Sequence, residues 1–149
     1  AGAELRSAKR MEDSVQIKKF EFSDIPQFGD LCDDSEWYSP QVKATTGALL
    51  RYKEYRDNCF VAYEGTELVG FIYGGVLCDT LYPQFMFVKE KNRKAGIGKR
   101  LMSALEESSH CGVSLIFYHK TLESHYQNEG YEVGTELRVA IKELLPPQG

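Results

Sequence analysis

The residues best suited to chemistry lie in segment 89–100, which reads KEKNRKAGIGKR. This segment holds six Lys or Arg residues, one Glu and two glycines, so its net charge is +5. A helix predicted over 96–109 begins inside the segment, and cations therefore surround the helix end that disfavours them. A bound anion would remove this conflict, because the first amides of a helix lack intrahelical partners and glycines admit a phosphate. We interpret the segment as an anion-binding turn, with a solvated basic turn as the alternative.

Two patterns narrow the kind of phosphate ligand. The chain lacks G-x-x-x-x-G-K-[ST], and G-I-G-K-R-L lacks the third glycine of a dinucleotide fingerprint. It does carry R-x-x-G-x-G over 93–98, directly after a predicted strand and at the start of a predicted helix. Tyr126 lies 33 positions after Arg93, within the second pattern, HKTLESHYQNEGY, at 119–131.

Together the two patterns resemble elements of the GNAT superfamily of N-acetyltransferases. Residues 93–98 are similar to the family's acetyl-CoA pyrophosphate loop. Residues 119–131 are similar to its N-x-x-x-x-x-x-Y-x-x-x-G-F element, with Tyr126, Gly130 and Tyr131 at the matching positions. His119 stands where the family usually has Asn. A helix and a strand are predicted between the patterns, as in the family.

The resemblance implies acetyl-CoA as co-substrate. Its pyrophosphate would lie on the amides of residues 94–99, and its pantetheine would pair like an added strand with the end of the strand predicted over 81–88. The implied cofactor contacts come from that strand end, the loop and the second pattern: Met86, Phe87, Val88, Arg93, Lys94, Ala95, Gly96, Ile97, Gly98, Lys99 and His119.

Tyr126 is the candidate catalytic acid for the departing thiolate. Reference pKa values near 10 for Tyr and 8.5 for a thiol make full proton transfer uphill by about 2 kcal/mol. A hydrogen bond with partial transfer would still help the thiolate to leave. The alternative is a core aromatic on a short helix.

The general base is left open by the sequence. The strand before the loop carries no acid after Asp79, although many GNAT enzymes have one there. Gln84 could position a water or the acceptor, but an amide cannot take the proton. Three options remain: a water relay, an acid from the loop 30–36, or an acceptor that arrives neutral.

An acidic, aromatic loop is the candidate acceptor site. Asp33, Asp34, Glu36 and Trp37 lie in the region that lines the acceptor side of GNAT folds. Carboxylates and an aromatic ring would suit a cationic amine through ion pairing and cation–π contact. A solvated polar loop is the alternative reading.

The elements that must position these residues are predicted in the order β-α-α-β-β-β-α-β-α-β, with one more strand allowed at the end. Apolar patterns predict strands over 15–22, 59–63, 68–76, 81–88 and 113–118, and one or two more over 131–142. Capping residues and helical periodicity predict a short helix near 23–26 and helices over 39–56, 96–109 and 121–129, the last capped by Thr121. The 96–109 helix has an apolar stripe of Ile97, Leu101, Ala104 and Leu105. The Gly65-Thr66 pair between two of the predicted strands suits a tight hairpin. We expect an α/β fold, GNAT-like, with a mixed sheet of about six or seven strands and about four flanking helices.

Composition bounds the remaining possibilities. The chain has 149 residues, which suits one domain over 11–149, with 1–10 set aside as an expression remnant or disordered arm. The resemblance implies that this is an acyl-CoA N-acyltransferase domain. Four scattered cysteines give no metal spacing and fit a reducing, cytoplasmic setting. No apolar run predicts a membrane span. A net charge of −4 leaves −9 outside the basic segment, which argues against a nucleic-acid partner.

We therefore predict a transferase that moves an acetyl group from acetyl-CoA to a small-molecule or peptide amine, as a monomer or homodimer. A GNAT-shaped module that binds CoA without turnover is one alternative. A phosphate- or RNA-binding domain that uses the basic turn alone is another.

Overall fold

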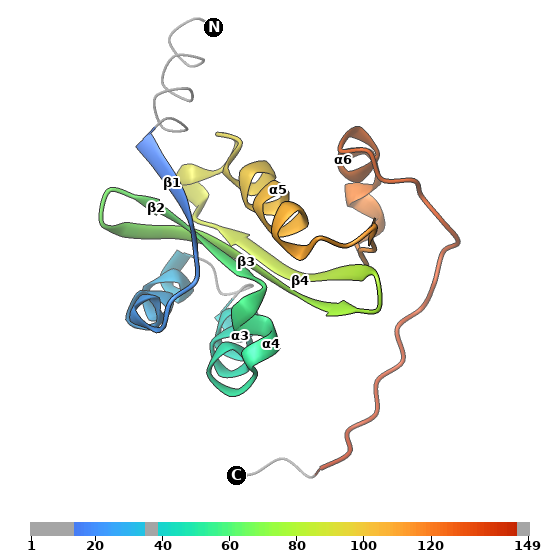
Figure 1. Cartoon of the computed structure of the whole chain (residues 1–149), viewed down its shortest axis with the longest axis horizontal. Helices are drawn as coiled ribbons and strands as arrows, with labels where there is room; N and C mark the ends of the chain where they lie inside the picture. Colours follow the sequence, from blue (N-terminus) through green and yellow to red (C-terminus); the bar gives the residue numbers. More distant parts are fainter. Residues whose placement is uncertain (1–13, 35–38, 146–149) are drawn as a thin grey trace, which may run out of the picture. The chain divides into compact units, whose positions relative to one another are not determined.

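The structure is a computed structural model that describes residues 14–34 and 39–145. The chain divides after Ile116 into two compact units, and each is described by itself. Within the described residues the first unit holds one five-stranded sheet in the order β1-β2-β3-β4-β5 (Figure 1). Its strands are β1 (Val15–Lys19), β2 (Cys59–Glu64), β3 (Glu67–Leu77), β4 (Thr80–Val88) and β5 (Val113–Ser114).

Neighbouring strands from β1 to β4 are antiparallel, and β5 joins β4 in parallel. Helix α5 (Ile97–Ser109) covers one face of the sheet. The opposite face carries the N-terminal helices, as Figure 1 shows for α3 and α4. These are η1 (Phe22–Asp24), α2 (Ile25–Phe28), η2 (Gly29–Asp34), α3 (Ser39–Arg51) and α4 (Lys53–Asp57).

The sheet is buried on both faces because apolar side chains point to both sides of its central strands. In β2, Ala62 belongs to the cluster beneath α5, whereas Val61 belongs to the cluster beneath the N-terminal helices. Of the predicted stripe on α5, Ile97, Leu101 and Leu105 are buried in the first of these clusters, and Ala104 is half-buried. Each such side chain contributes about 1.5–3 kcal/mol by leaving water.

The single helix predicted over 39–56 is broken at Tyr52. This residue has extended backbone angles (φ −116°, ψ 114°) and separates α3 from α4. Arg56 of α4 turns back and donates from Nη1 to the carbonyl oxygens of Leu49 and Leu50 at 3.0 and 3.3 Å. These bonds satisfy carbonyls that the end of α3 leaves without helical partners. A capping contact from a later turn is not visible in helical periodicity, which is why the prediction ran through the break.

A bulge interrupts β4 at Gln84. Tyr73 lies opposite Phe85 and Gly74 lies opposite Pro83, so Gln84 has no partner in β3. A Cβ on Gly74 would stand 2.7 Å from the Tyr82 carbonyl oxygen, so glycine permits the close approach of the two strands here. An extra residue reverses the facing of every side chain beyond it.

The second unit, from Phe117 onward, contains η4 (Lys120–Leu122) and α6 (Glu123–Asn128). Gly130 follows α6 with φ 93°, as expected for a glycine that ends a helix. The predicted strands over 131–142 are wrong, because no strand occurs there in the structure. Of the predicted strand over 113–118, only two residues pair. The described chain thus has five strands and five α-helices, against the six or seven strands and about four helices expected.

The prediction of strands over 131–142 failed because an alternating pattern defines two faces of a segment but supplies no neighbouring strand to hydrogen-bond with. Leu137, Val139 and Ile141 alternate as strand residues do, yet they are 72%, 86% and 87% exposed.

In the described parts of the chain, no helix is both long and apolar enough to span a membrane.

Candidate cofactor site

The turn between β4 and α5 has a backbone suited to an anion. After η3 (Glu90–Asn92), both Lys94 and Gly96 adopt positive φ values of 68° and 79°. Gly96 is the N-cap of α5 and offers no side-chain cap. Arg100 N–H donates to the Gly96 carbonyl at 3.1 Å and is the first amide to enter the helix ladder. The amides of residues 97–99 therefore have no intrahelical partner, which is the arrangement that binds phosphate.

Gly98 has a packing reason that sequence reasoning missed. A Cβ at this position would stand 3.2 Å from Cε and 3.4 Å from Sδ of Met86. The first turn of α5 therefore lies close against β4, and two predicted cofactor residues are neighbours. Ala95 and Ile97 bury their side chains in the core, so only their backbone could face a ligand.

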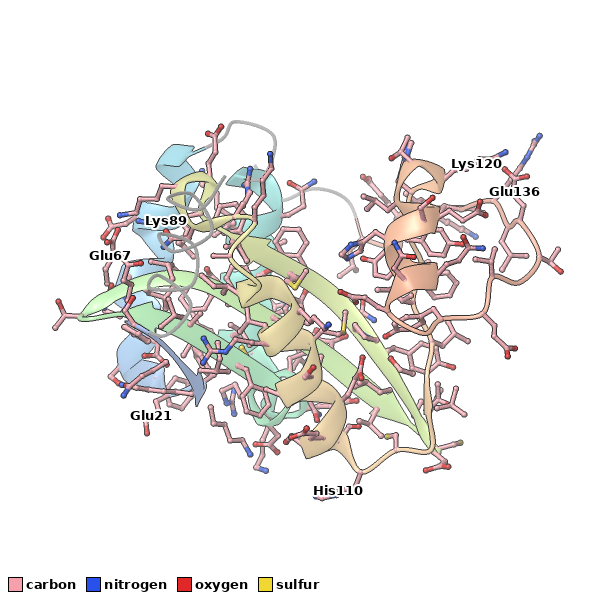
Figure 2. The ribbon with its side chains drawn as sticks, turned by 90° about the horizontal axis from the view of Figure 1, so that it is seen from above. Glu21, Glu67, Lys89, His110, Lys120 and Glu136 are labelled. Atoms are coloured by element: carbon pink, nitrogen blue, oxygen red, sulfur yellow. The ribbon has the colours of Figure 1, made fainter. Side chains whose placement is uncertain are left out.

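The basic cluster separates into residues that hold the fold together and residues that face solvent. Lys89 and Lys91 both pair with Glu67, at 3.0 and 2.9 Å (Figure 2 shows Lys89 and Glu67). By contrast, the exposed Lys94 and Lys99 make no ion pair with any of the described residues. In the sequence these two lysines flank the amides of α5 that have no intrahelical partner. The positive charge available to an anion is thus smaller than the +5 of segment 89–100, and it lies next to the first amides of α5.

The two arginines of the segment contact backbone. Arg93 donates from Nε to the Val88 carbonyl at 2.8 Å, and its guanidinium lies over the Phe87 ring at 5.7 Å. Arg100 donates from Nη2 to the Val15 carbonyl at 3.0 Å and ties α5 to β1. Each arginine therefore braces an element that borders the loop.

The backbone of β4 is open on one side beyond Leu81. β5 pairs only with Thr80 and Leu81, so residues 82–88 have no strand partner on that side in the described ranges. Lys89 N–H donates to the Val69 carbonyl in β3. Backbone groups alternate along a strand, so those of Phe87 also point to β3. Those of Met86 and Val88 point to the open side, where the Val88 carbonyl already accepts from Arg93 Nε. An added strand would therefore meet Met86 and the Val88 N–H, and not Phe87.

The bulge decides where Gln84 stands. Strict alternation would put it on the face of Tyr82 and Met86, but Leu81 and Met86 pack in the same cluster beneath α5. Side-chain alternation therefore changes sense between the two ends of β4. The change occurs at Gln84, whose side chain is exposed. The alternation of polar and apolar residues in the sequence of β4 does not indicate where such a bulge lies.

Tyr126 is buried on α6 within an aromatic group. Its ring centroid lies 5.1 Å from that of Tyr118 and 5.7 Å from that of Tyr131. Burial, and then the nearby Glu129 carboxylate, raise the pKa of Tyr126 above its ordinary value. The phenol is therefore fully protonated at neutral pH and is a weaker acid than free Tyr.

His119 caps the first turn of the second unit. Its Nδ1 accepts from the Thr121 N–H at 3.3 Å and lies 2.9 Å from the Thr121 hydroxyl. Since an amide N–H can only donate, Nδ1 is the acceptor and the proton of the neutral ring sits on Nε2. The sequence predicted Thr121 as the cap, and the structure gives that role to His119.

The predicted acceptor residues fall mostly beyond the structure. Asp33 and Asp34 end η2, but their side chains lie outside the described residues, as do Glu36 and Trp37 altogether. In the ranges 14–34 and 39–145 no group of three His, Cys, Asp or Glu side chains could hold a metal.

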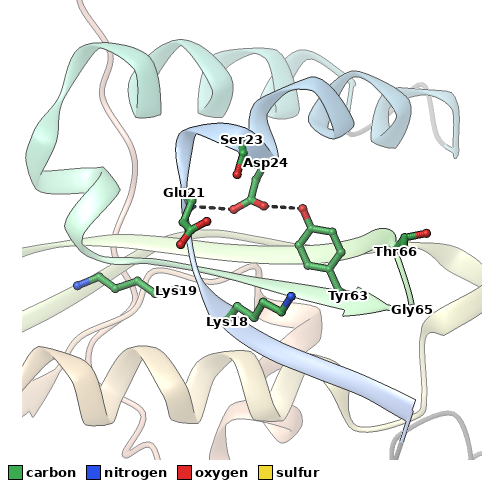
Figure 3. Close-up of a pocket in the computed structure, with 8 residues that line it drawn as sticks. All are labelled: Lys18, Lys19, Glu21, Ser23, Asp24, Tyr63, Gly65 and Thr66. Carbon is green, nitrogen blue, oxygen red and sulfur yellow. Dashed lines mark hydrogen bonds between the residues drawn. The ribbon is translucent and has the colours of Figure 1, made fainter.

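A separate polar pocket of about 520 Å³ lies beside β1 and the β2–β3 turn (Figure 3). Inside it the Tyr63 hydroxyl donates to Asp24 Oδ1 at 2.5 Å, and Glu21 N–H donates to Asp24 Oδ2 at 2.8 Å. Burial and the Asp24 carboxylate raise the pKa of Tyr63. None of the predicted site residues lines this pocket, which belongs to the packing of η1 against the sheet.

Comparison with known proteins defines the class of protein. A sequence model described as the acetyltransferase (GNAT) domain matches residues 55–133, more than half of the chain. The protein therefore belongs to the GNAT acetyltransferase family. No curated protein matches its sequence significantly.

Solved structures agree on the fold. One is the aminoglycoside N-acetyltransferase AAC(6')-Iy bound to the bisubstrate analogue CoA-S-monomethyl-acetylneamine. It shares 15% identity over 87% of this chain and 98% of that chain, with a TM-score of 0.68. Another is an aminoglycoside acetyltransferase from an uncultured soil metagenomic sample, in complex with sisomicin (17% identity, 91% and 99% coverage, TM-score 0.65). A third is glucosamine-6-phosphate N-acetyltransferase from Arabidopsis thaliana (14% identity, 87% and 99% coverage, TM-score 0.62).

Proposed function

We propose that this protein transfers an acetyl group from acetyl-CoA to a primary amine by direct attack in a ternary complex. The observation that supports this most is the first turn of α5. There, a left-handed Gly96 leaves the amides of residues 97–99 without intrahelical partners beside the open edge of β4. That turn would take the pyrophosphate, with Lys94 and Lys99 at its sides. The backbone of Met86 and Val88 would take the pantetheine.

In this mechanism the amine nitrogen attacks the thioester carbon, the carbon–sulfur bond breaks, and sulfur leaves with the bonding electrons. Tyr126 donates its phenolic proton, fully or in part, to that sulfur. Because burial raises the pKa of Tyr126, a strong hydrogen bond is favoured over complete transfer. The attacking amine must lose a proton to water or to an acid of loop 30–36, or arrive neutral. Gln84 could orient the amine or the water.

The negative charge of loop 30–36 supports an acceptor that carries positive charge. The four acids of this loop and the adjacent Trp37 would favour a cationic amine. The two aminoglycoside acetyltransferases among the structural neighbours were solved with an acetylneamine analogue and with sisomicin, which supports a small-molecule amine. A peptide amine remains within the same chemistry.

Thiol release from acetyl-CoA over a panel of aminoglycosides, polyamines, amino acids and peptides tests the proposal. Tyr126→Phe should lower kcat by about 10²-fold or more, the usual contribution of a general acid, with little change in CoA affinity. Tyr118→Phe is the matched control, because its ring lies 5.1 Å from that of Tyr126 in the same cluster. Equal turnover by wild type and Tyr126→Phe would remove the catalytic role. A wild type that binds CoA but acetylates nothing would instead favour the non-catalytic module.

The acceptor proposal has its own test. Reversing the charge of Asp33, Asp34 and Glu36 to Lys should raise KM for a cationic acceptor and leave KM for acetyl-CoA unchanged. Each acid is also reversed singly, and Glu107→Lys, an exposed reversal on α5 that changes the net charge by the same amount as one of these, is the control. An unchanged acceptor KM in the loop variant would contradict the assignment.

A further inference from the structure

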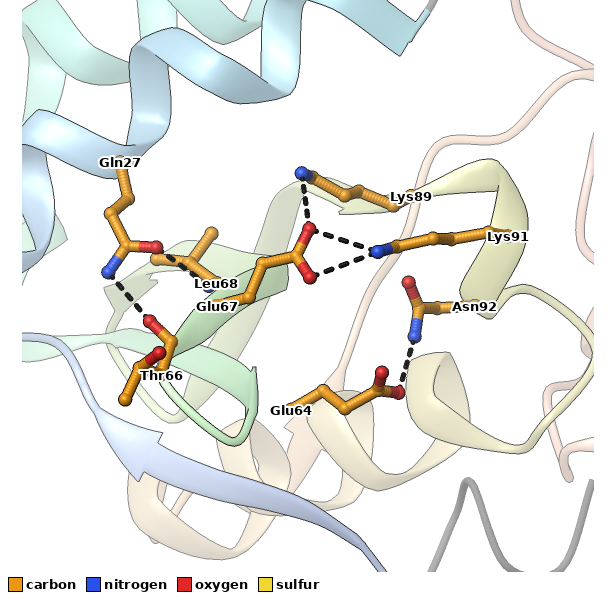
Figure 4. Close-up of polar contacts among 8 residues, drawn as sticks. All are labelled: Gln27, Glu64, Thr66, Glu67, Leu68, Lys89, Lys91 and Asn92. Carbon is orange, nitrogen blue, oxygen red and sulfur yellow. Dashed lines mark hydrogen bonds and ion pairs between the residues drawn. The ribbon is translucent and has the colours of Figure 1, made fainter.

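We propose that Asn92 and the carboxylates of the β2–β3 hairpin tip (residues 64–67) act together as a latch that positions the loop 93–98 for CoA. This inference rests on the proposed function only in taking that loop as the CoA site. It assigns positioning residues, not catalytic ones. Figure 4 shows the contacts that carry it.

Asn92 is the centre of the latch. It ends η3 directly before Arg93 and is only 1% exposed. Its Nδ2 donates to Glu64 Oε2 at 3.0 Å (Figure 4). Its Oδ1 is also buried and has no hydrogen-bond partner in the described parts of the chain. A buried amide that satisfies only one of its polar atoms weakens the fold, so stability alone does not account for Asn at this position.

Glu67 holds the same turn from its other end. Its Oε1 lies 3.0 Å from Lys89 Nζ and its Oε2 lies 2.9 Å from Lys91 Nζ. The Lys89 side chain is only 12% exposed, whereas the Glu67 side chain is 42% exposed, so the lysine is held against the fold and the carboxylate still meets water. The two lysines also lower the pKa of Glu67, so its carboxylate stays charged at neutral pH. Two carboxylates three residues apart thereby hold residues 89, 91 and 92.

The hairpin tip is itself fastened to the core. Gln27 of α2 donates from Nε2 to the Thr66 carbonyl at 3.2 Å, and its Oε1 accepts from Leu68 N–H at 2.9 Å (Figure 4). The tip therefore offers η3 a fixed anchor. On the far side of the loop, the first turn of α5 packs on Met86 through Gly98.

A fixed anchor matters because the loop is held in a rare conformation. Lys94 has φ 68° without being glycine, and such residues persist only where the surrounding structure enforces them. If the latch is released, the loop populates other conformations and the apparent CoA affinity falls by the fraction that remains competent. A purely structural fastening would instead change stability and leave CoA affinity alone.

CoA affinity measured by calorimetry, together with Tm, separates these two cases. Asn92→Leu keeps the size of the side chain and removes both polar atoms. Its CoA Kd should rise about 5- to 10-fold, as for a competent fraction of about 10–20%, while Tm changes little. Asn58→Leu is the matched control, because Asn58 Nδ2 donates to the Glu54 carbonyl at 2.9 Å, outside the latch. This control should keep wild-type CoA affinity.

Reversing the hydrogen bond makes a sharper test. Asn92→Asp sets a carboxylate against Glu64 and should weaken CoA binding. Adding Glu64→Gln to Asn92→Asp supplies an amide that donates in the opposite direction, and the double variant should recover at least half of the lost affinity. Failure of this recovery, or an Asn92→Leu Kd equal to that of Asn58→Leu, would overturn the latch. A wild type that binds CoA but releases no thiol with any amine would overturn the proposed function and leave the latch standing.

Discussion

Gly96→Val probes the N-cap on which the proposed CoA site depends. Gly96 has φ 79° and ψ 6°, a conformation that costs an L-residue about 1–2 kcal/mol and is least tolerated by β-branched side chains. For a chain of this size, 1 kcal/mol corresponds to about 2–4 °C in Tm. The variant should therefore fold with a Tm lowered by about 2–8 °C.

The effect on CoA should be larger than this strain. Moving the N-cap turns the amides of residues 97–99 away from the pyrophosphate. One lost hydrogen bond to a charged oxygen is worth about 1.5–3 kcal/mol, which is about 10- to 150-fold in Kd. Loss of two such bonds would abolish measurable binding at ordinary concentrations.

Gly130→Val is the matched control, because Gly130 also has positive φ (93°) and a Cβ there would meet nothing within 4 Å. Thermal unfolding should show a similar loss of Tm in both variants. Calorimetry with CoA should show the loss of affinity in Gly96→Val alone. If both variants bind CoA as wild type does, the assignment of the turn is refuted. If both lose it equally, the loss follows from strain and not from the N-cap.

Three further outcomes are expected. Lys94→Gly should raise Tm by about 2–4 °C, because relief of the φ 68° strain is worth about 1 kcal/mol. It should also weaken CoA binding and its salt dependence in calorimetry, and unchanged CoA affinity would contradict a phosphate contact. The raised pKa of Tyr63 adds stability that is complete below about pH 10 and is lost as pH rises toward the folded-state pKa. Tm of wild type should therefore fall above pH 10, and Tyr63→Phe should flatten that fall; parallel curves would refute this. Burial raises the pKa of Cys59, so peptide mapping after brief iodoacetamide treatment at pH 8 should find exposed Cys78 alkylated and Cys59 intact. Equal labelling would show that the core opens readily.

Local sequence patterns predicted much of the secondary structure of the first unit. Turn residues at 65–66 between two apolar runs predicted the β2–β3 hairpin, and the apolar stripe beginning at Ile97 predicted α5 within one residue. Gly96 was identified as special from the charge conflict around it, and it proves to have positive φ. These features are governed by neighbours a few positions apart, which a sequence displays directly.

The failures share a different physical cause. The break at Tyr52 depends on Arg56 reaching back to α3, and the bulge at Gln84 depends on how β4 meets β3. The alternation of residues 137–141 predicted a strand, but a strand also needs an adjacent backbone to pair with. Periodicity reports which faces are apolar, not which partner is present.

The sequence by itself determined the family, through two patterns 33 positions apart, and placed a +5 segment at the start of a helix. Only the tertiary structure decided what those charges do. It pairs Lys89 and Lys91 with Glu67, sends Arg93 and Arg100 to backbone carbonyls, and leaves Lys94 and Lys99 flanking the open amides of α5. Formal charge is a property of residue type, whereas the charge available to a ligand depends on which partners the fold brings within hydrogen-bonding distance.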